Sequence, residues 1–146
     1  IKPTVGFFSM GVYKVSNHQE WLDSINSIHA EMQQLRDLYP EAVLDTGRFI
    51  IEQYISGEEF AIDAYFDGNG ESVIVGIFKH TFASEQDVSD RVYTTSKEII
   101  EQHLEEFTSF VRQIGLLAGV KHFPVHIELR KGSDGRLIPI EVNPCV

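Results

Sequence analysis

Two segments of the chain carry apolar residues at the three- and four-residue spacing of an amphipathic helix. The first begins after Asn17, where Glu20 completes a capping-box pattern, and it ends before Pro40. The second begins after Thr95, with Glu98 three residues further on, and its apolar positions again line one face. The pattern therefore predicts two long helices, each with one side available to a core.

Shorter stretches alternate apolar and polar residues, which is typical of strands. The clearest alternation lies in residues 60–66, and the Asp-Gly-Asn-Gly sequence that follows predicts a turn into the next strand. Residues 83–94 have no period and predict a polar loop. The predicted strands are residues 1–3, 49–55, 60–66 and 72–82, followed by a hairpin over 122–142. This order predicts an α+β fold rather than a parallel, doubly wound sheet.

The length and the charge narrow the classes of function. A chain of 146 residues predicts one domain or two interlocked lobes. With 12 Lys and Arg against 22 Asp and Glu, the net charge of −10 disfavours a nucleic-acid or anionic-membrane surface. It does not disfavour nucleotides, because a few local cations, backbone amides or Mg²⁺ can hold phosphates in an acidic protein.

Cys145 is the only cysteine, so the chain has no internal disulfide and no thiolate zinc site. This favours a reducing compartment, and we expect the cytoplasm. No apolar run approaches the roughly 18 residues of a membrane span, and no signal-peptide pattern opens the chain. Because the chain opens on Ile1 inside a predicted strand and stops directly after another, we interpret it as an internal piece of a longer protein.

The final hairpin carries the most specific pattern. A two-residue turn at Asp134-Gly135, a favoured type I′ pair, would leave one face mostly apolar and the other polar. The register that this turn predicts pairs His126 with Asn143, Ile127 with Val142, Glu128 with Glu141, Leu129 with Ile140, and Lys131 with Ile138.

Glu128 and Glu141 would then face each other on the polar side, at a cost of up to about 1 kcal/mol. A hard cation such as Mg²⁺, which prefers oxygen ligands, would offset this repulsion. Two other readings stay open on the residues alone. The pair could be a solvated acidic face bridged by Arg130 or Lys131, or the two carboxylates could share a proton and raise one pKa.

Two further segments contain residues that could bind a ligand. Lys2-Pro3 precedes a loop with Gly6, Ser9 and Gly11, whose amides could approach phosphate, although a plain turn explains the loop equally well. The loop has neither the P-loop nor the dinucleotide pattern. Residues 50–60 contain several acids around Gly57, which a strand end and an exposed turn would also explain.

Taken in this order, these segments resemble the ATP-grasp family over nearly the whole chain. The matching motifs are Lys2-Pro3 with loop 4–11, Glu52 to Glu59, Glu128, and Glu141-Val142-Asn143-Pro144. The resemblance implies an ATP-grasp-like α+β fold with a mainly antiparallel sheet, two long helices and a nucleotide cleft between two lobes. Residues 1–54 would be part of the small lobe, and residues 55–146 the C-terminal lobe with a metal-binding hairpin.

The resemblance also implies roles for individual residues. ATP would be bound with Mg²⁺, or with Mn²⁺ as an alternative ion. Lys2, Ser9 and Gly11 would contact the phosphates; Glu52 and the backbone of Gln53 and Ile55 would contact adenine; Glu59 would bind the ribose; Glu128, Glu141 and Asn143 would ligate the metal.

The activity implied is carboxylate activation, in which an acyl phosphate formed from ATP is attacked by an amine or a similar nucleophile. Lys79 could reach the transferred phosphate, Arg91 could bind a substrate carboxylate or merely pair with Asp90, and His126 could donate to phosphate or to metal-bound water. We expect His103 to be a core histidine whose polar atoms are satisfied. The expected partners are small-molecule carboxylate and amine substrates and the remainder of the chain, without nucleic acid or membrane; an oligomer is left open.

Two alternatives belong to other classes of function. The chain could be a non-catalytic, nucleotide-binding ATP-grasp-like domain with a regulatory or assembly role. It could also be a plain α+β interaction domain whose acidic face is only solvated. For the ligase reading, we expect this piece to be inactive by itself.

Overall fold

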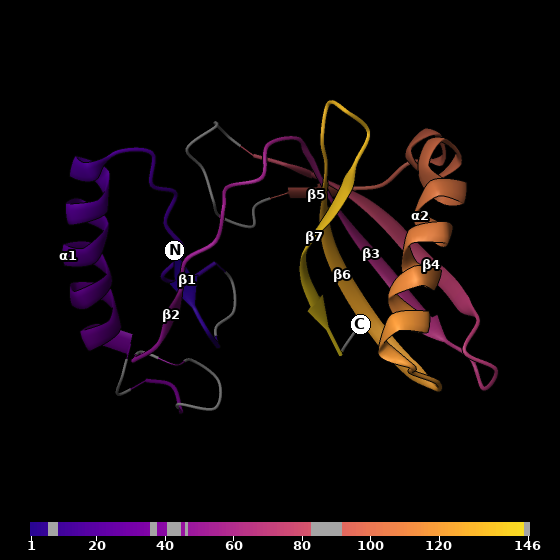
Figure 1. The fold of residues 1–146 in the computed structure, drawn as a ribbon, viewed down its shortest axis with the longest axis horizontal. Helices are drawn as coiled ribbons and strands as arrows, with labels where there is room; N and C mark the ends of the chain where they lie inside the picture. The colour runs from indigo at the N-terminus through magenta and orange to yellow at the C-terminus, as the bar shows by residue number, and fades with distance from the viewer. Residues whose placement is uncertain (6–8, 36–37, 41–44, 46, 83–91, 145–146) are drawn as a thin grey trace. The chain divides into compact units, whose positions relative to one another are not determined.

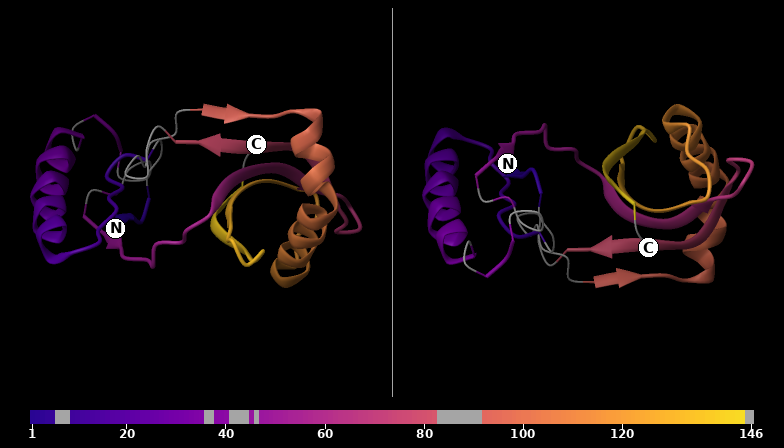
Figure 2. Two further views of the ribbon diagram at one scale, coloured as in Figure 1. Left: turned by 90° about the horizontal axis from the view of Figure 1, so that it is seen from above. Right: turned by 90° about the horizontal axis from the view of Figure 1, so that it is seen from below.

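The computed structural model describes residues 1–5, 9–35, 38–40, 45, 47–82 and 92–144. The chain divides into two compact units (Figures 1 and 2). Unit 1 comprises Ile1–Tyr54 with Phe82–Asp90, and unit 2 comprises Ile55–Thr81 with Arg91–Val146. The assignment of residues 1–54 and 55–146 to the two lobes of an ATP-grasp fold stays a prediction.

The described residues of unit 1 form a small antiparallel sheet and one helix. Strand β1 (Lys2–Pro3) pairs with β2 (Phe49–Ile50), so the predicted strand over 49–55 is wrong beyond its first two residues. Helix α1 (His18–Leu35) begins at the predicted cap, where the Asn17 side chain accepts from the Glu20 amide at 3.0 Å.

Unit 2 is an antiparallel sheet with a long helix along one face (Figures 1 and 2). In the described residues the sheet has five strands in the order β5-β4-β3-β6-β7. The elements are β3 (Glu58–Phe66), β4 (Ser72–Thr81), β5 (Val92–Thr94), α2 (Lys97–Ala118), β6 (Phe123–Lys131) and β7 (Leu137–Asn143). The predicted α+β class with a mainly antiparallel sheet is confirmed.

Three local predictions in unit 2 need correction. The predicted polar loop over 83–94 is wrong at its end, because residues 92–94 form the edge strand β5; residues 83–91 lie outside the described residues. The cap of α2 is Ser96 rather than Thr95, and its hydroxyl accepts from the Ile99 amide at 3.2 Å. The hairpin turn is longer than predicted and shifts part of the register, as described next.

The predicted pairing of the β6–β7 hairpin is confirmed only at its open end. His126 faces Asn143, Ile127 faces Val142, and Glu128 faces Glu141. A register shift then follows Glu128, so the predicted partners of Leu129 and Lys131 are wrong. Leu129 faces Pro139 and Lys131 faces Leu137.

The difference has a local cause at the turn. Gly132 donates to the carbonyl of Arg136, and Gly135 donates to the carbonyl of Gly132, both at 3.0 Å. The loop therefore spans residues 132–136 rather than two residues. A bulge on β7 absorbs the resulting offset, and Pro139, which has no N–H to contribute to a ladder, lies beside it.

Strict alternation along the strands produces the core. Alternate side chains of β3 and β6 turn towards α2, and those from Phe60 to Phe66 and from Phe123 to Leu129 are apolar. The buried cluster consists of Phe60, Ile62, Ala64, Phe66, Ile77, Phe107, Val111, Val125, Ile127 and Leu129. His103 is buried beside it and stacks on Phe107 with ring centroids 5.0 Å apart, which confirms its predicted place in the core. The prediction that it is satisfied there is wrong at Nδ1, which has no hydrogen-bond partner among the described residues.

Within the described ranges, neither α1 nor α2 has a stretch of apolar sequence long enough to cross a membrane.

The packing of α2 on β3 predicts an unusual response to a helix-favouring substitution. A Cβ at Gly115 would lie 2.1 Å from Cε1 of the buried Phe66 ring. Gly115→Ala should therefore lower the free energy of unfolding by about 1–3 kcal/mol in urea unfolding, although Ala normally favours a helix interior. Leu117→Ala, at a side chain that is 90% exposed, is the control and should change it by less than about 0.5 kcal/mol. A more stable Gly115→Ala protein would contradict this packing.

Candidate functional site

The face of the unit 2 sheet opposite α2 gathers charged side chains from four strands. We call this the polar face. Because apolar positions alternate towards α2, the intervening positions of paired strands lie together on the other side. The polar face comprises Glu59, Asp63, His80, His126, Glu128, Arg130, Glu141 and Asn143.

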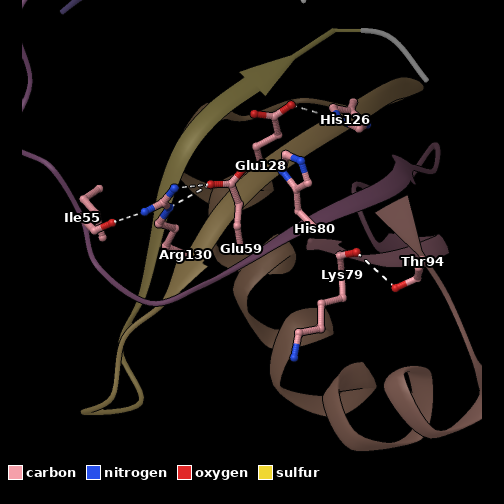
Figure 3. Close-up of polar contacts among 8 residues, drawn as sticks. All are labelled: Ile55, Glu59, Lys79, His80, Thr94, His126, Glu128 and Arg130. Carbon is pink, nitrogen blue, oxygen red and sulfur yellow. Dashed lines mark hydrogen bonds and ion pairs between the residues drawn. The ribbon is translucent and has the colours of Figure 1, made fainter. Parts of the chain in front are cut away.

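One part of the polar face is a buried ionic network around Glu59 (Figure 3). Arg130 binds Glu59 Oε2 through Nε at 2.8 Å and Nη2 at 2.7 Å. His80 Nδ1 lies 2.9 Å from Glu59 Oε1, and its ring stacks on Tyr93 at 4.4 Å. Arg130 Nη1 also donates to the carbonyl of Ile55 at 2.7 Å. Glu59 is 8% exposed, so its charge is held by paired donors rather than by bulk solvent.

A second cluster lies further along β3 and β6. His126 Nδ1 hydrogen-bonds Asp63 Oδ1 at 2.7 Å, and its Nε2 lies 3.6 Å from Glu128 Oε1. The interaction with Glu128 and the hydrogen bond with Asp63 raise the pKa of His126 to about 9, against the opposing effect of burial. At 3.6 Å the Glu128 contact acts mainly through charge, whereas Asp63 accepts a true hydrogen bond. His126 is therefore a cation at neutral pH.

The three predicted metal ligands lie on adjacent strands of this face. Glu128 faces Glu141, and Asn143 is two residues beyond Glu141 on the same side of β7. Among the described residues, no group of three or more His, Cys, Asp or Glu side chains is arranged to hold a metal ion. Two carboxylates and an amide nevertheless fit Mg²⁺, which is usually bound by one or two carboxylates together with substrate phosphates rather than by a full protein cage.

The cations proposed to bridge the acidic pair are engaged elsewhere. Arg130 binds Glu59, and Lys131 Nζ lies 2.5 Å from Glu106 on α2. The positive group beside Glu128 is instead His126. The structure thus places a cation at one edge of the facing carboxylates rather than across both of them.

In unit 1 the structure brings two of the predicted nucleotide contacts together. Lys2 Nζ lies 2.9 Å from Glu52 Oε2, since Lys2 belongs to β1 and Glu52 follows its paired strand β2 by two residues. Gly11 lies close to β1. Gly11 has φ 71°, and a Cβ there would lie 3.0 Å from Pro3 Cγ. Ser9 also has a positive φ of 53°, which is uncommon for a non-glycine residue.

The other predicted contacts fall in different places. Gln53 is exposed in unit 1, and Ile55 is the first residue of unit 2, with its carbonyl bound to Arg130. Arg91 lies outside the described residues. Lys79 points away from the polar face and pairs with Glu58, because on β4 the neighbouring His80 occupies the polar side (Figure 3). The structure therefore does not bring Lys79 to the other candidates.

Sequence reasoning missed Asp63 and the central role of Arg130. A usable signal was present: Glu59 and Asp63 are charged residues four apart in one predominantly apolar strand, and therefore share one face. The pairing of β3 with β6, which joins Glu59 to Arg130 and Asp63 to His126, is a long-range contact that no local pattern specifies.

A shallow, open hollow also lies along α2, away from the polar face. It is lined by Gln102, Glu105, Glu106, Ser109, Phe110, Gln113 and Leu137. Its lining is mostly exposed polar helix surface, whose polar groups do not converge on one position, so we do not consider it a candidate site.

The chain as a whole, residues 1–146, matches the family model of the ATP-grasp domain. The chain belongs to the ATP-grasp family. A comparison with curated protein sequences finds no significant match.

Solved structures share the ATP-grasp fold of this chain. An L-amino acid ligase from Bacillus licheniformis has a TM-score of 0.59 and 23% identity over 93% of this chain and 32% of its own. The Campylobacter jejuni biotin carboxylase in complex with β-γ-ATP has a TM-score of 0.63 and 12% identity over 97% of this chain and 30% of its own. The biotin carboxylase domain of Hydrogenobacter thermophilus 2-oxoglutarate carboxylase, solved with MgADP, ADP and bicarbonate, has a TM-score of 0.55 and 15% identity over 99% of this chain and 30% of its own. The ATP-grasp chain thus spans about a third of each of these proteins.

The His126 cluster predicts a pH-dependent stability. The folded pKa of about 9 exceeds the usual value of 6.5, so the stabilisation is complete below pH 6.5 and is lost as pH rises towards 9. The free energy of unfolding, measured with urea, should fall by on the order of 2 kcal/mol as the pH rises over this range.

Asp63→Asn should lower the His126 pKa, measured by NMR titration, and flatten this loss. Asp23→Asn on the exposed side of α1 is the matched control and should leave both unchanged. A His126 pKa near 6.5 in the wild-type protein would refute the cluster's electrostatics.

Proposed function

We propose that this chain is the nucleotide- and metal-handling part of an ATP- and Mg²⁺-dependent ligase. The family membership supports ATP-dependent ligation, and the observation that carries the proposal is the facing pair Glu128 and Glu141 with Asn143 on the same side of the sheet. A solvated surface gains nothing from two directly opposed carboxylates, whereas a divalent cation with phosphate ligands uses them.

Glu128, Glu141 and Asn143 would hold Mg²⁺, with Mn²⁺ as an alternative ion. When bound, the metal would neutralise charge that develops on the transferred phosphate. The MgADP present in the structure of the 2-oxoglutarate carboxylase domain supports magnesium in this family. His126, a cation next to Glu128, would donate a hydrogen bond towards a phosphate oxygen.

Further residues would contact the nucleotide itself. Lys2 would exchange Glu52 for a phosphate oxygen, and Glu52 would then accept from the adenine amino group. Ser9 and Gly11 would present backbone amides to the phosphates, while Gln53 and Ile55 would contact the base through their backbone. Glu59 would bind ribose through its remaining lone pairs, since a carboxylate has about four and the observed donors occupy three.

The chemistry would proceed in two balanced displacements. A substrate carboxylate oxygen attacks the γ-phosphorus, and ADP departs to leave an acyl phosphate. An amine, or a similar nucleophile, then attacks the acyl carbon, loses a proton and expels inorganic phosphate. The described residues need only orient the reactants and stabilise phosphate charge, because no enzyme nucleophile is required. The L-amino acid ligase similarity supports small carboxylate and amine substrates.

The metal assignment predicts a linked change in stability. Mg²⁺-ATP should raise the midpoint of thermal unfolding of the full-length protein, because a ligand that binds only the folded state stabilises it. Glu141→Gln, which removes one carboxylate ligand, should abolish most of this shift. Glu101→Gln on the exposed side of α2 is the matched control and should retain it. Equal protection of the Glu141→Gln and wild-type proteins would rule out the metal assignment.

The acyl phosphate predicts a trappable intermediate. With ATP, Mg²⁺ and hydroxylamine, the full-length protein should convert its carboxylate substrate to a hydroxamate and release ADP, assayed across a panel of amino acids and other small acids. Nucleotide binding without hydroxamate or phosphate release with any acid would favour the alternative, a non-catalytic nucleotide-binding domain.

A further inference from the structure

A single guanidinium joins the polar face to the backbone where unit 2 begins. Arg130 Nη1 donates to the Ile55 carbonyl at 2.7 Å, while its Nε and Nη2 bind Glu59 Oε2 (Figure 3). Residues 51–57 lie between β2 and β3 and belong to neither helix nor strand. This segment therefore receives from Arg130 a hydrogen bond that a sheet ladder would otherwise supply.

The orientation of Arg130 is fixed from several sides. Its side chain is 13% exposed, and its planar fork makes two contacts with Glu59. Glu59 is held in turn by His80, whose ring stacks on Tyr93 with an interplanar angle of 20°. Each of these groups restrains the next. The position of the Ile55 carbonyl is therefore set by side chains on the strands rather than by its own segment.

We propose that Arg130 is a positioning residue that holds the backbone at Ile55 in place for recognition of the nucleotide base. This rests on the proposed function, in which the Ile55 backbone contacts adenine. Arg130 acts through Ile55 and not on the nucleotide itself. A backbone already held in the bound conformation loses less conformational freedom when the base binds, which strengthens binding.

The Arg130→Lys substitution separates positioning from charge. Lysine keeps the positive charge that Glu59 requires but is a point donor without the planar fork, so it does not bind Glu59 and the Ile55 carbonyl in the same way. Arg130→Met removes both contacts and risks misfolding, because it leaves Glu59 buried with a lost partner. Arg136→Lys is the matched control, since Arg136 is exposed in the hairpin loop and pairs with Asp134.

The experiment measures three quantities in the full-length protein: the Kd of Mg²⁺-ATP, the backbone ¹⁵N order parameters of Ile55 and Ser56, and the thermal midpoint without nucleotide. For Arg130→Lys we expect Mg²⁺-ATP binding about tenfold weaker, lower order parameters at these two residues and a near-normal midpoint. Arg136→Lys should match the wild-type protein in all three.

The possible outcomes distinguish the two proposals. Wild-type-like binding or unchanged order at Ile55 in Arg130→Lys would overturn the positioning role while leaving the proposed function intact. A lower midpoint with reduced order throughout unit 2 would also overturn it in favour of a purely structural role. Failure of the wild-type protein to bind Mg²⁺-ATP would overturn both.

Discussion

The two-residue alternation of the unit 2 sheet is the constraint on which the other features depend. One set of alternate side chains is apolar and packs against α2, which fixes the pairing of β3 with β4 and β6. Any slip of one residue would bury Glu59 and Asp63 in the core and expose Phe60 and Ile62. The cost of that exchange holds the polar face together, although the polar residues contribute little favourable burial of their own.

This constraint explains why so acidic a chain tolerates carboxylates close together. The alternation places Glu59, Asp63, Glu128 and Glu141 on one face. The same face carries the cations Arg130 and His126, which pair with two of these acids. Arg130 is paired with Glu59 at 2.7 Å, and His126 with Asp63 at 2.7 Å. Glu141, directly opposite Glu128, is the acid furthest from these two cations in the register. The remaining negative charge is therefore concentrated where the divalent ion is proposed to bind.

Local patterns were sufficient to predict what local physics determines. The helices and the α+β class follow from periodicity and caps. The facing pair Glu128 and Glu141 was predicted from a two-residue turn that the structure replaces with a longer loop, and the pairing is kept because the bulge on β7 offsets that difference. The predicted register failed from Leu129 onwards because a bulge and a five-residue loop change the offset without changing the periodicity. Arg130 and Asp63 were missed because their partners lie 71 and 63 residues away, at positions set by strand order rather than by sequence spacing.

The similar structures share only 12% to 23% sequence identity with this chain, which fits the difference between the core side and the polar face of the sheet. Core positions need only apolar side chains of suitable volume, so many sequences satisfy them. The polar face is more demanding, because each buried charge requires a partner with correct geometry, as Glu59 illustrates with donors from two different strands. Its Arg130 fork reaches both a carboxylate and a backbone carbonyl, which a lysine does not reproduce. Differences among ATP-grasp proteins in how they hold the nucleotide base should therefore be sought in such second-layer contacts, which leave the fold itself unchanged.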